Sequence, residues 1–398
     1  MKNTLFYFIF FPFIGLISAL KHYRSNWAKP TIIAFVAFFG MSMVKNEQVD
    51  SYRYISKLEQ MYASTKDFST VLDSFYSEVD GQPDLYVGIV TYLFSLITNN
   101  ANILFLFYGF VFGYFYVNNV WFILEESKGR LPWLPILLIV TFSFVFGFWT
   151  VTGVRMNTAA HVFFYGGFLY LYRQKKKGLL IAISSILFHF SFALPVILLL
   201  IYSLLKINYR FLYIFYIASF FVAELNVEVV RILLETYLPD FIQPRVDRYL
   251  NEEYIDSIAE TYVTANWYVV YFQKFLSYFT LVFISVLFFK TDLNSSLKKL
   301  LGFTLLFLAV ANIVSLLPSG GRFLNVAFLF SMACSFIIVA QNRFKIANNT
   351  ARALSPLLII FCIVSIRSSF DFFNITTLTN PIVVMFTDIN KPLIEFFK

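Results

Sequence analysis

The chain has 398 residues, of which 59% are hydrophobic and only 14% carry charge, against about 25% charged residues in a typical soluble domain. Water therefore cannot be the main solvent of the folded chain, which excludes an ordinary soluble domain. The formal net charge of +8 does not indicate a nucleic-acid partner, because the basic residues fall in short loops between apolar runs.

Long apolar runs recur along the chain and predict membrane-spanning helices. Crossing a hydrocarbon core about 30 Å thick takes about 20 helical residues, and apolar runs of this kind lie at 101–123, 267–289, 299–317 and 352–366. They must be helical, because an unpaired backbone amide in lipid costs several kcal/mol, and they lack the alternation of barrel strands. The expected fold class is all-α, a polytopic integral membrane protein with about a dozen transmembrane helices in a single domain over 1–398.

The first apolar run, Leu5 to Leu20, is interpreted as a membrane helix rather than as a signal peptide. No small-residue cleavage site follows it, only the basic stretch from Lys21 to Arg24. Basic loops mark the cytoplasmic side of a membrane, and the loops rich in Lys and Arg are 21–29, 125–130, 173–177, 206–210, 290–299 and 341–352. With these loops inside, both termini are expected outside.

Two longer segments, 46–98 and 224–266, mix acids, bases and aromatic residues and are expected on the external side. Within the first, 84–97 is predicted to be a re-entrant or interfacial helix, because a crossing there would turn the basic loops outward. The run 178–205 is too long for one crossing and basic at both ends. It predicts two short helices that meet near the outer face, with His189 close to the tip. One tilted helix is the alternative, and it would put 224–266 in the cytoplasm.

Two arginines follow apolar helices at their expected outer ends. Arg155 offers a planar guanidinium that suits phosphate or pyrophosphate, and Gly153 would let a backbone or a ligand come close. Arg322 follows the turn 318–321, whose free amides and helix dipole form a ready anion site. The alternatives are an arginine that extends to the membrane interface at 155 and an ordinary turn with one surface arginine at 322.

Histidine and aspartate are the candidate bases. His189 lies between two phenylalanines and is followed by Ser191. A neutral imidazole there could accept a proton from an acceptor hydroxyl, although a packed histidine is the alternative. Asp50 is the other candidate base, and solvated loop charge is its alternative.

Aromatic residues near these acids form a candidate sugar-binding arrangement. Tyr54 falls on one helix face with Asp50 at i,i+4 spacing, and Tyr52 lies between them. Tyr86 follows in the segment 82–86. A carboxylate beside aromatic rings is common in sugar-binding sites.

The segment 224–266 carries Arg245 and Arg248, which could contact pyrophosphate. With Glu252 they form an i, i+3, i+7 stripe that a salt-bridged amphipathic helix also explains. The chain lacks P-loop, GxGxxG and HExxH motifs. Its two cysteines lie inside apolar runs, so neither a metal nor a cofactor is expected.

Taken in order, these motifs resemble those of the EpsG/Wzy family of bacterial exopolysaccharide and O-antigen polymerases. The resemblance covers about residues 40–340 and rests on short motifs, namely Asp50-x-Tyr52-x-Tyr54, Pro83 to Tyr86, Gly153-x-Arg155 with Ala159 and Ala160, the Lys-rich loop 175–177, Phe188-His189-x-Ser191 and Arg322. Two positions depart from the family pattern. Met156 follows the arginine where Gln is frequent, and Asp84 stands where a small residue is usual.

The resemblance implies a GT-C fold in the bacterial cytoplasmic (inner) membrane, with the active site facing the periplasm or exterior. The implied substrate is undecaprenyl pyrophosphate-linked oligosaccharide, and the growing chain moves to the non-reducing end of a new repeat. Arg155 and Arg322 would bind pyrophosphate with support from Arg245 and Arg248, while His189 or Asp50 activates the acceptor. Membrane lipid, a chain-length regulator and a flippase are the further partners suggested.

Two other functions stay open at this point. An O-antigen ligase-like transferase would use the same donor, but 224–266 is short for an acceptor-seating domain. A transporter or flippase of lipid-linked oligosaccharide tends to show internal repeats, and the sequence shows none.

Overall fold

The computed structural model describes residues 9–45, 50–63, 84–127, 129–205, 207–222, 266–290, 293–317, 319–342, 344–387 and 389–397. The elements in chain order are α2 (Pro12–Lys21), α3 (Ala28–Ser42), α4 (Asp50–Ala63), α6 (Leu85–Ser95), α7 (Ala101–Leu124), α8 (Trp133–Val145), η1 (Phe148–Thr152), α9 (Met156–Leu171), α10 (Lys177–Phe188), η2 (Phe190–Phe192), α11 (Ala193–Leu204), α12 (Tyr209–Val222), α16 (Trp267–Lys290), α17 (Ser295–Val314), α18 (Gly321–Gln341), α19 (Lys345–Ala353), α20 (Ser355–Ser369), η3 (Ile375–Leu378), α21 (Pro381–Met385) and η4 (Leu393–Phe397).

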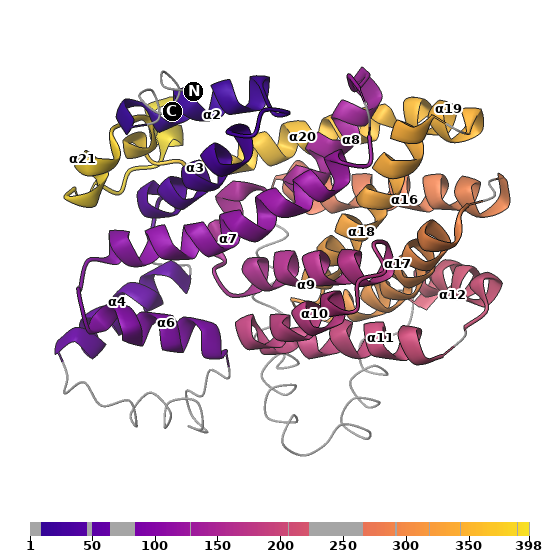
Figure 1. Ribbon diagram of the computed structural model, residues 1–398, viewed down its shortest axis with the longest axis horizontal. Helices are drawn as coiled ribbons and strands as arrows, with labels where there is room; N and C mark the ends of the chain where they lie inside the picture. Colours follow the sequence, from indigo (N-terminus) through magenta and orange to yellow (C-terminus); the bar gives the residue numbers. More distant parts are fainter. Residues whose placement is uncertain are drawn as a thin grey trace, which may run out of the picture.

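The all-α class is confirmed for these residues, and the fold is that of a helical membrane protein (Figure 1). Five described helices are long and apolar enough to cross a membrane, and the α19–α20 pair, bent by 50°, would be a sixth. Six shorter apolar segments of 10–17 residues accompany them. The expected dozen crossings and the GT-C arrangement therefore stay predictions.

Two buried apolar cores hold the bundle together. One surrounds α18, where Phe330 packs against Phe163 of α9 and Phe303 of α17. The other joins α3 to α7 and η1, with Phe148 in edge contact with Phe35 and Phe39. The cores meet at the junction of η1 and α9, because Val154 belongs to the second core and Met156 to the first.

Small residues let α3 and α7 approach closely. A Cβ added to Gly40 would lie 2.5 Å from the Phe105 carbonyl oxygen and 2.9 Å from Cα of Gly109. In a membrane, where water does not drive helices together, such backbone contact between small residues is a main source of helix association.

Basic loops gather at one end of the bundle. Arg24 donates to the Gly129 carbonyl, Lys299 Nζ lies 3.5 Å from Gln174 Oε1, and the Tyr202 hydroxyl donates to the Lys299 carbonyl at 2.9 Å. These contacts bring together the loops near 24, 129, 174 and 299, as loop charge predicts. The assignment of this end to the cytoplasm stays a prediction.

At the opposite end the C-terminal segment packs beside the end of α3. The Val44 N–H donates to the Phe372 carbonyl at 3.0 Å, and the Lys45 N–H donates to Asn390 Oδ1 at 2.8 Å.

The run 178–205 consists of two short helices, α10 and α11, separated at His189. α10 starts beside the basic loop 173–177, and Tyr202 of α11 returns to Lys299 at that same end. The chain therefore runs into the bundle and returns to the same end, and His189 lies at the turning point.

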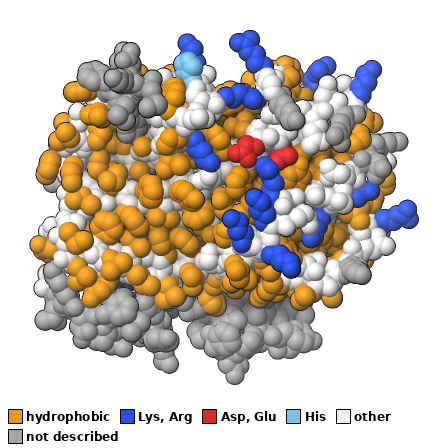
Figure 2. Space-filling view, in the orientation of Figure 1, with side chains coloured by type: hydrophobic (Ala, Val, Ile, Leu, Met, Phe, Trp, Pro, Cys, Tyr) orange, Lys and Arg blue, Asp and Glu red, His pale blue; other side chains and the backbone are white. Residues whose placement is uncertain are grey.

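The surface matches a membrane location. Figure 2 shows apolar side chains over most of one face, with the Lys and Arg side chains concentrated toward the right of the view. Soluble monomers rarely expose contiguous apolar patches larger than a few hundred Å². Phe110 is 49% exposed and Ile382 is 65% exposed, and with Pro30 of α3 they line an apolar groove of about 630 Å³ between helices.

The close α3–α7 contact predicts a sharp response to one added side chain. We expect Gly40→Val to lower the free energy of unfolding by about 1–3 kcal/mol, the usual cost of overpacking, because its Cβ meets backbone atoms. The measurement is the thermal midpoint of the protein purified in detergent. Gly321→Ala is the control, since its nearest neighbour is the flexible Gln273 side chain at 3.7 Å. Equal midpoints for the two variants would contradict the close-contact argument.

Candidate functional site

A buried carboxylate joins two of the polar positions that the sequence singled out. Asp84 directly precedes α6 and is only 3% exposed. Its Oδ2 accepts a hydrogen bond from Nη1 of Arg155 at 2.9 Å, and its Oδ1 accepts one from the Phe190 N–H at 2.8 Å. Nδ1 of His189 lies 3.5 Å from Oδ1, a longer contact. Asp84 thus connects the start of α9 with the break between α10 and η2.

Local chain geometry directs Arg155 toward this carboxylate. η1 ends at Thr152, and Arg155 takes the position just before α9. Asn157 turns back and donates from Nδ2 to the Thr150 carbonyl at 2.7 Å. A Cβ on Gly153 would lie 2.4 Å from that Nδ2. The space beside Gly153 is therefore filled by the Asn157 side chain, and the approach of a ligand there stays a prediction.

The break at His189 supplies both a side chain and a backbone donor. His189 leaves the helix with an extended backbone (φ −153°, ψ 118°). The amide of Phe190 is consequently freed from α-helical bonding, and it donates to Asp84. A single interruption of the helix therefore presents the imidazole and the amide to the same carboxylate.

Lys57 of α4 is a further member of the cluster, which the sequence analysis missed. Ser51, Tyr54 and Leu58 form the buried stripe of this helix, and Lys57 lies beside that stripe. Burial, followed by the positive charge of Arg155, lowers the pKa of Lys57 below its ordinary value. Within the described part of the chain no carboxylate forms an ion pair with Lys57.

Among the described residues, the cluster holds one carboxylate, Asp84, and two cationic side chains, Arg155 and Lys57. Burial alone would raise the pKa of Asp84, but the contact with His189, the Phe190 amide and Arg155 together lower it below its ordinary value. Asp84 thus pairs with Arg155 and lies beside His189, and Lys57 is close enough to Arg155 to be affected by its charge. Cationic side chains at a partly buried position suit an anionic ligand.

The cluster is recessed into the bundle. Tyr86, two residues after Asp84, contacts Tyr108 with ring centroids 5.6 Å apart and Phe188 at 4.5 Å. Phe188 in turn lies 6.5 Å from Phe115. Tyr108 and Phe115 are in the middle of α7, so the aromatic residues next to Asp84 and His189 pack against the middle of that helix. Buried ionisable groups are costly unless they are paired, and they are candidates for functional positions.

The other predicted pyrophosphate ligands are not brought into the cluster by described contacts. Arg322 is exposed near the start of α18, and its side chain makes no hydrogen bond or ion pair with a described residue. Its neighbour Phe323 contacts Phe192, near His189. Arg245 and Arg248 lie outside the described residues, and so does the side chain of Asp50, the first residue of α4.

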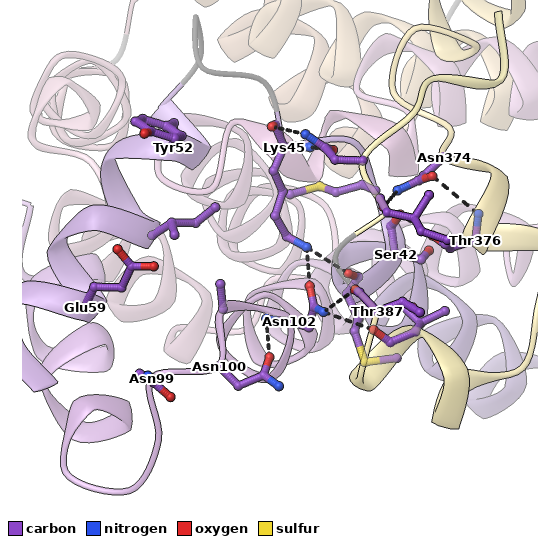
Figure 3. A pocket seen from close by; sticks show the side chains of 17 residues that line it. Ser42, Lys45, Tyr52, Glu59, Asn99, Asn100, Asn102, Asn374, Thr376 and Thr387 are labelled. Atoms are coloured by element: carbon purple, nitrogen blue, oxygen red, sulfur yellow. Dashed lines mark hydrogen bonds between the residues drawn. The ribbon is translucent and has the colours of Figure 1, made fainter. Parts of the chain in front are cut away.

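The three tyrosines predicted to bind sugar differ in their surroundings. Tyr54 is 2% exposed and packs against Tyr108, and its role in binding sugar stays a prediction. Tyr86 packs between Tyr108 and Phe188. These contacts hold the start of α6, next to Asp84, in place. Tyr52 is 46% exposed and borders a polar cavity of about 490 Å³ (Figure 3).

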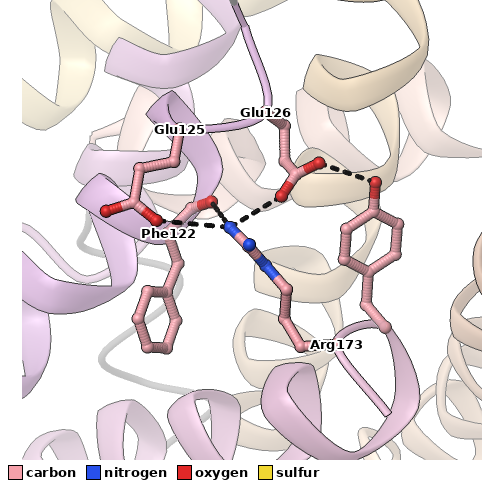
Figure 4. Close-up of polar contacts among 5 residues, drawn as sticks. Phe122, Glu125, Glu126 and Arg173 are labelled. Atoms are coloured by element: carbon pink, nitrogen blue, oxygen red, sulfur yellow. Dashed lines mark hydrogen bonds and ion pairs between the residues drawn. The ribbon is translucent and has the colours of Figure 1, made fainter.

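A second ionic group lies at the basic end and has a structural role. Nη2 of Arg173 pairs with Glu126 at 2.7 Å and with Glu125 at 3.3 Å, and it also approaches the Phe122 carbonyl (Figure 4). The Tyr172 hydroxyl donates to Glu126 at 2.9 Å. Here the carboxylates of Glu125 and Glu126 compensate the positive charge of Arg173, and these contacts hold the end of α9 against the end of α7.

No family model, no curated protein and no solved structure matches this chain.

Replacing Asp84 tests the organisation of the cluster. We expect Asp84→Asn to destabilise the protein by about 3–5 kcal/mol, because it leaves Arg155 without the buried charge that it faces. Asp371→Asn, which breaks the exposed pair with Arg367, is the matched control and should cost less than about 1 kcal/mol. Thermal midpoints in detergent measure both.

The effect of Asp84 should also depend on pH in a defined direction. Its pKa is lowered by folding, so its contribution is fully present above the unfolded pKa of about 3.9 and is lost as the pH falls through the lower folded value. The difference between wild type and Asp84→Asn should narrow below about pH 4. A difference that widens with acid would contradict the assignment.

Proposed function

We propose that this protein is a metal-independent membrane glycosyltransferase, a polysaccharide polymerase of the EpsG/Wzy type. It would transfer a growing glycan from undecaprenyl pyrophosphate onto the non-reducing end of a lipid-linked repeat unit, at the outer side of the bacterial cytoplasmic membrane. The observation that carries the proposal is the buried Asp84 with Arg155 and His189 beside it, and with Lys57 near enough to Arg155 to be affected by its charge. A lipid diphosphate suits it, because such a ligand brings adjacent negative charges to a membrane-embedded position.

In the proposed reaction, the acceptor hydroxyl oxygen bonds to the anomeric carbon as the bond from that carbon to the diphosphate oxygen breaks. The electron pair leaves with the diphosphate, and Arg155 and Lys57 stabilise the developing charge. The hydroxyl proton passes to Nε2 of His189, whose Nδ1 faces Asp84. Asp50 is the second candidate base, and Arg322, Arg245 and Arg248 are further proposed contacts of the carrier.

Two rival functions use the same anion site. A ligase-like transferase would break the same bond and pass the glycan to another acceptor, whereas a transporter or flippase of lipid-linked oligosaccharide would bind the diphosphate without breaking it. A transport assay in proteoliposomes separates the transporter from the transferases. A GT-C fold and partnership with a chain-length regulator and a flippase belong to the proposal as well.

Inorganic pyrophosphate should bind and stabilise the cluster. At a concentration 100 times its dissociation constant, a ligand adds about 2.7 kcal/mol to the free energy of unfolding. We expect Lys57→Met to raise the thermal midpoint without ligand, because it removes a desolvated charge repelled by Arg155, and to reduce the stabilisation by pyrophosphate. The control is Lys391→Met, an exposed lysine, which should leave both quantities unchanged. The same pyrophosphate shift in wild type and Lys57→Met would contradict the site.

Glycan ladders test the reaction itself. In cells that lack their own polymerase and make the matching repeat unit, wild type should restore a ladder. Arg155→Ala should give only single capped repeats, since removal of one essential charge-stabilising donor costs about a hundredfold or more in rate. Arg210→Ala, an exposed arginine at the basic end, is the control. Normal chain lengths from Arg155→Ala would defeat the proposal, and no ladder from well-expressed wild type would favour the transporter.

A further inference from the structure

A second site lies beside α4, away from the charged cluster. Figure 3 shows Tyr52 and Glu59 projecting from α4 toward one side of a cavity, with Asn374, Thr376 and Thr387 of the C-terminal segment on the other. Its volume of about 490 Å³ falls within the range of small-molecule sites, about 300–1,000 Å³.

The cavity and the charged cluster are on opposite flanks of α4. Tyr52, Ile55 and Glu59 line the cavity, and their i, i+3, i+7 spacing puts them on one face of the helix. Lys57 is five residues from Tyr52, which at about 100° per residue turns it to the far side. The buried stripe of α4 separates the two faces. The cavity is therefore not an extension of the anion site.

The chemistry of the lining is polar and nearly uncharged. Five asparagines from two distant parts of the chain line it, namely Asn99, Asn100, Asn102, Asn374 and Asn390. The ammonium of Lys45 donates to the Met41 carbonyl and to Asn102 Oδ1, and Glu59 adds a negative charge at the rim. A ligand would meet mainly amide groups here, and the lining contains one cationic and one anionic side chain, Lys45 and Glu59.

Several of these amides are held in fixed orientations. Asn100 and Asn102 donate to the Met385 and Val384 carbonyls, each at 3.0 Å. Asn390 donates to the Lys45 carbonyl at 2.7 Å and accepts from the Lys45 N–H. Asn102 also donates to the Thr387 carbonyl at 3.3 Å and accepts from Lys45. These amides therefore fix the walls of the cavity.

Three other groups have no such structural task. The Tyr52 hydroxyl, the Glu59 carboxylate and the Asn99 amide border the cavity and make no hydrogen bond with any described residue. A ligand with many hydroxyls matches this set, because each hydroxyl both donates and accepts. The exposed ring of Tyr52 adds an apolar face of the kind that packs against a sugar ring.

We infer that this cavity binds the uncharged saccharide chain of the substrate or product at a position remote from the bond that is made. The inference rests on the proposed polymerase function and goes beyond it, since it assigns a retention site for the growing glycan. Glycan held there stays on the protein between transfers, so the pocket acts on chain length and not on the chemical step.

The test measures two quantities, the chain length of the glycan and the affinity of the protein for a free oligosaccharide. Tyr52→Ala, Glu59→Ala and Asn99→Ala should each still give a ladder, but with a lower modal number of repeats than wild type. The probe for binding is the free repeat-unit oligosaccharide, released by mild acid from the lipid-linked intermediate of the same cells. Each variant should bind it about two- to tenfold more weakly, the equivalent of one neutral hydrogen bond.

Gln60→Ala and Tyr62→Ala are the matched controls, because both residues are exposed on α4 and neither lines the cavity. Wild-type chain lengths and wild-type binding in all three cavity variants would overturn the inference while the polymerase function stands. If wild type makes no ladder, the polymerase proposal fails separately. Binding of the oligosaccharide that Tyr52→Ala weakens would then still support the pocket, and no binding to wild type would overturn it.

Discussion

A buried carboxylate must be matched by charge and by hydrogen bonds, and Asp84 sets this constraint on the whole site. Arg155 and the Phe190 amide satisfy its two oxygens, and His189 faces one of them. These partners come from the start of α9 and from the broken helix 178–205. The position of three chain segments therefore depends on one side chain, because an unmatched buried charge is costly.

The same constraint explains why the site lies where the two apolar cores meet. Val154 packs in the α3–α7 core and Met156 in the core around α18, so Arg155 is fixed from both sides. Lys57 is the exception, since burial and the charge of Arg155 both disfavour its ammonium form. The Lys57 ammonium therefore lowers the stability of the folded protein. Binding sites often contain such a charge when the ligand carries the opposite one.

Local patterns predicted much of the framework. The length of the apolar runs predicted the membrane helices, and loop charge predicted that the basic loops lie at one end of the bundle. The Phe-His-Phe sequence inside an overlong apolar run predicted the break at His189. Contacts between residues far apart in the sequence could not be predicted from these local patterns. Asp84 was noted only as a departure from a family pattern, because nothing nearby in sequence reveals a partner 71 residues away. The burial of Tyr54 was not foreseen for a related reason, since spacing puts it on a helix face but does not say which face is buried.

The order in which the chain is synthesised limits when Asp84 can become buried. Asp84 enters the membrane region before its partners, which follow 71 and 106 residues later. At a synthesis rate of about 5–20 residues per second, Arg155 and the amide of Phe190 are made several seconds or longer after Asp84. During that interval the Asp84 carboxylate must stay hydrated or be protonated. α6 can therefore take its final recessed position only after α9 and the α10–α11 hairpin have arrived, which makes the docking of this short helix a late step in biogenesis.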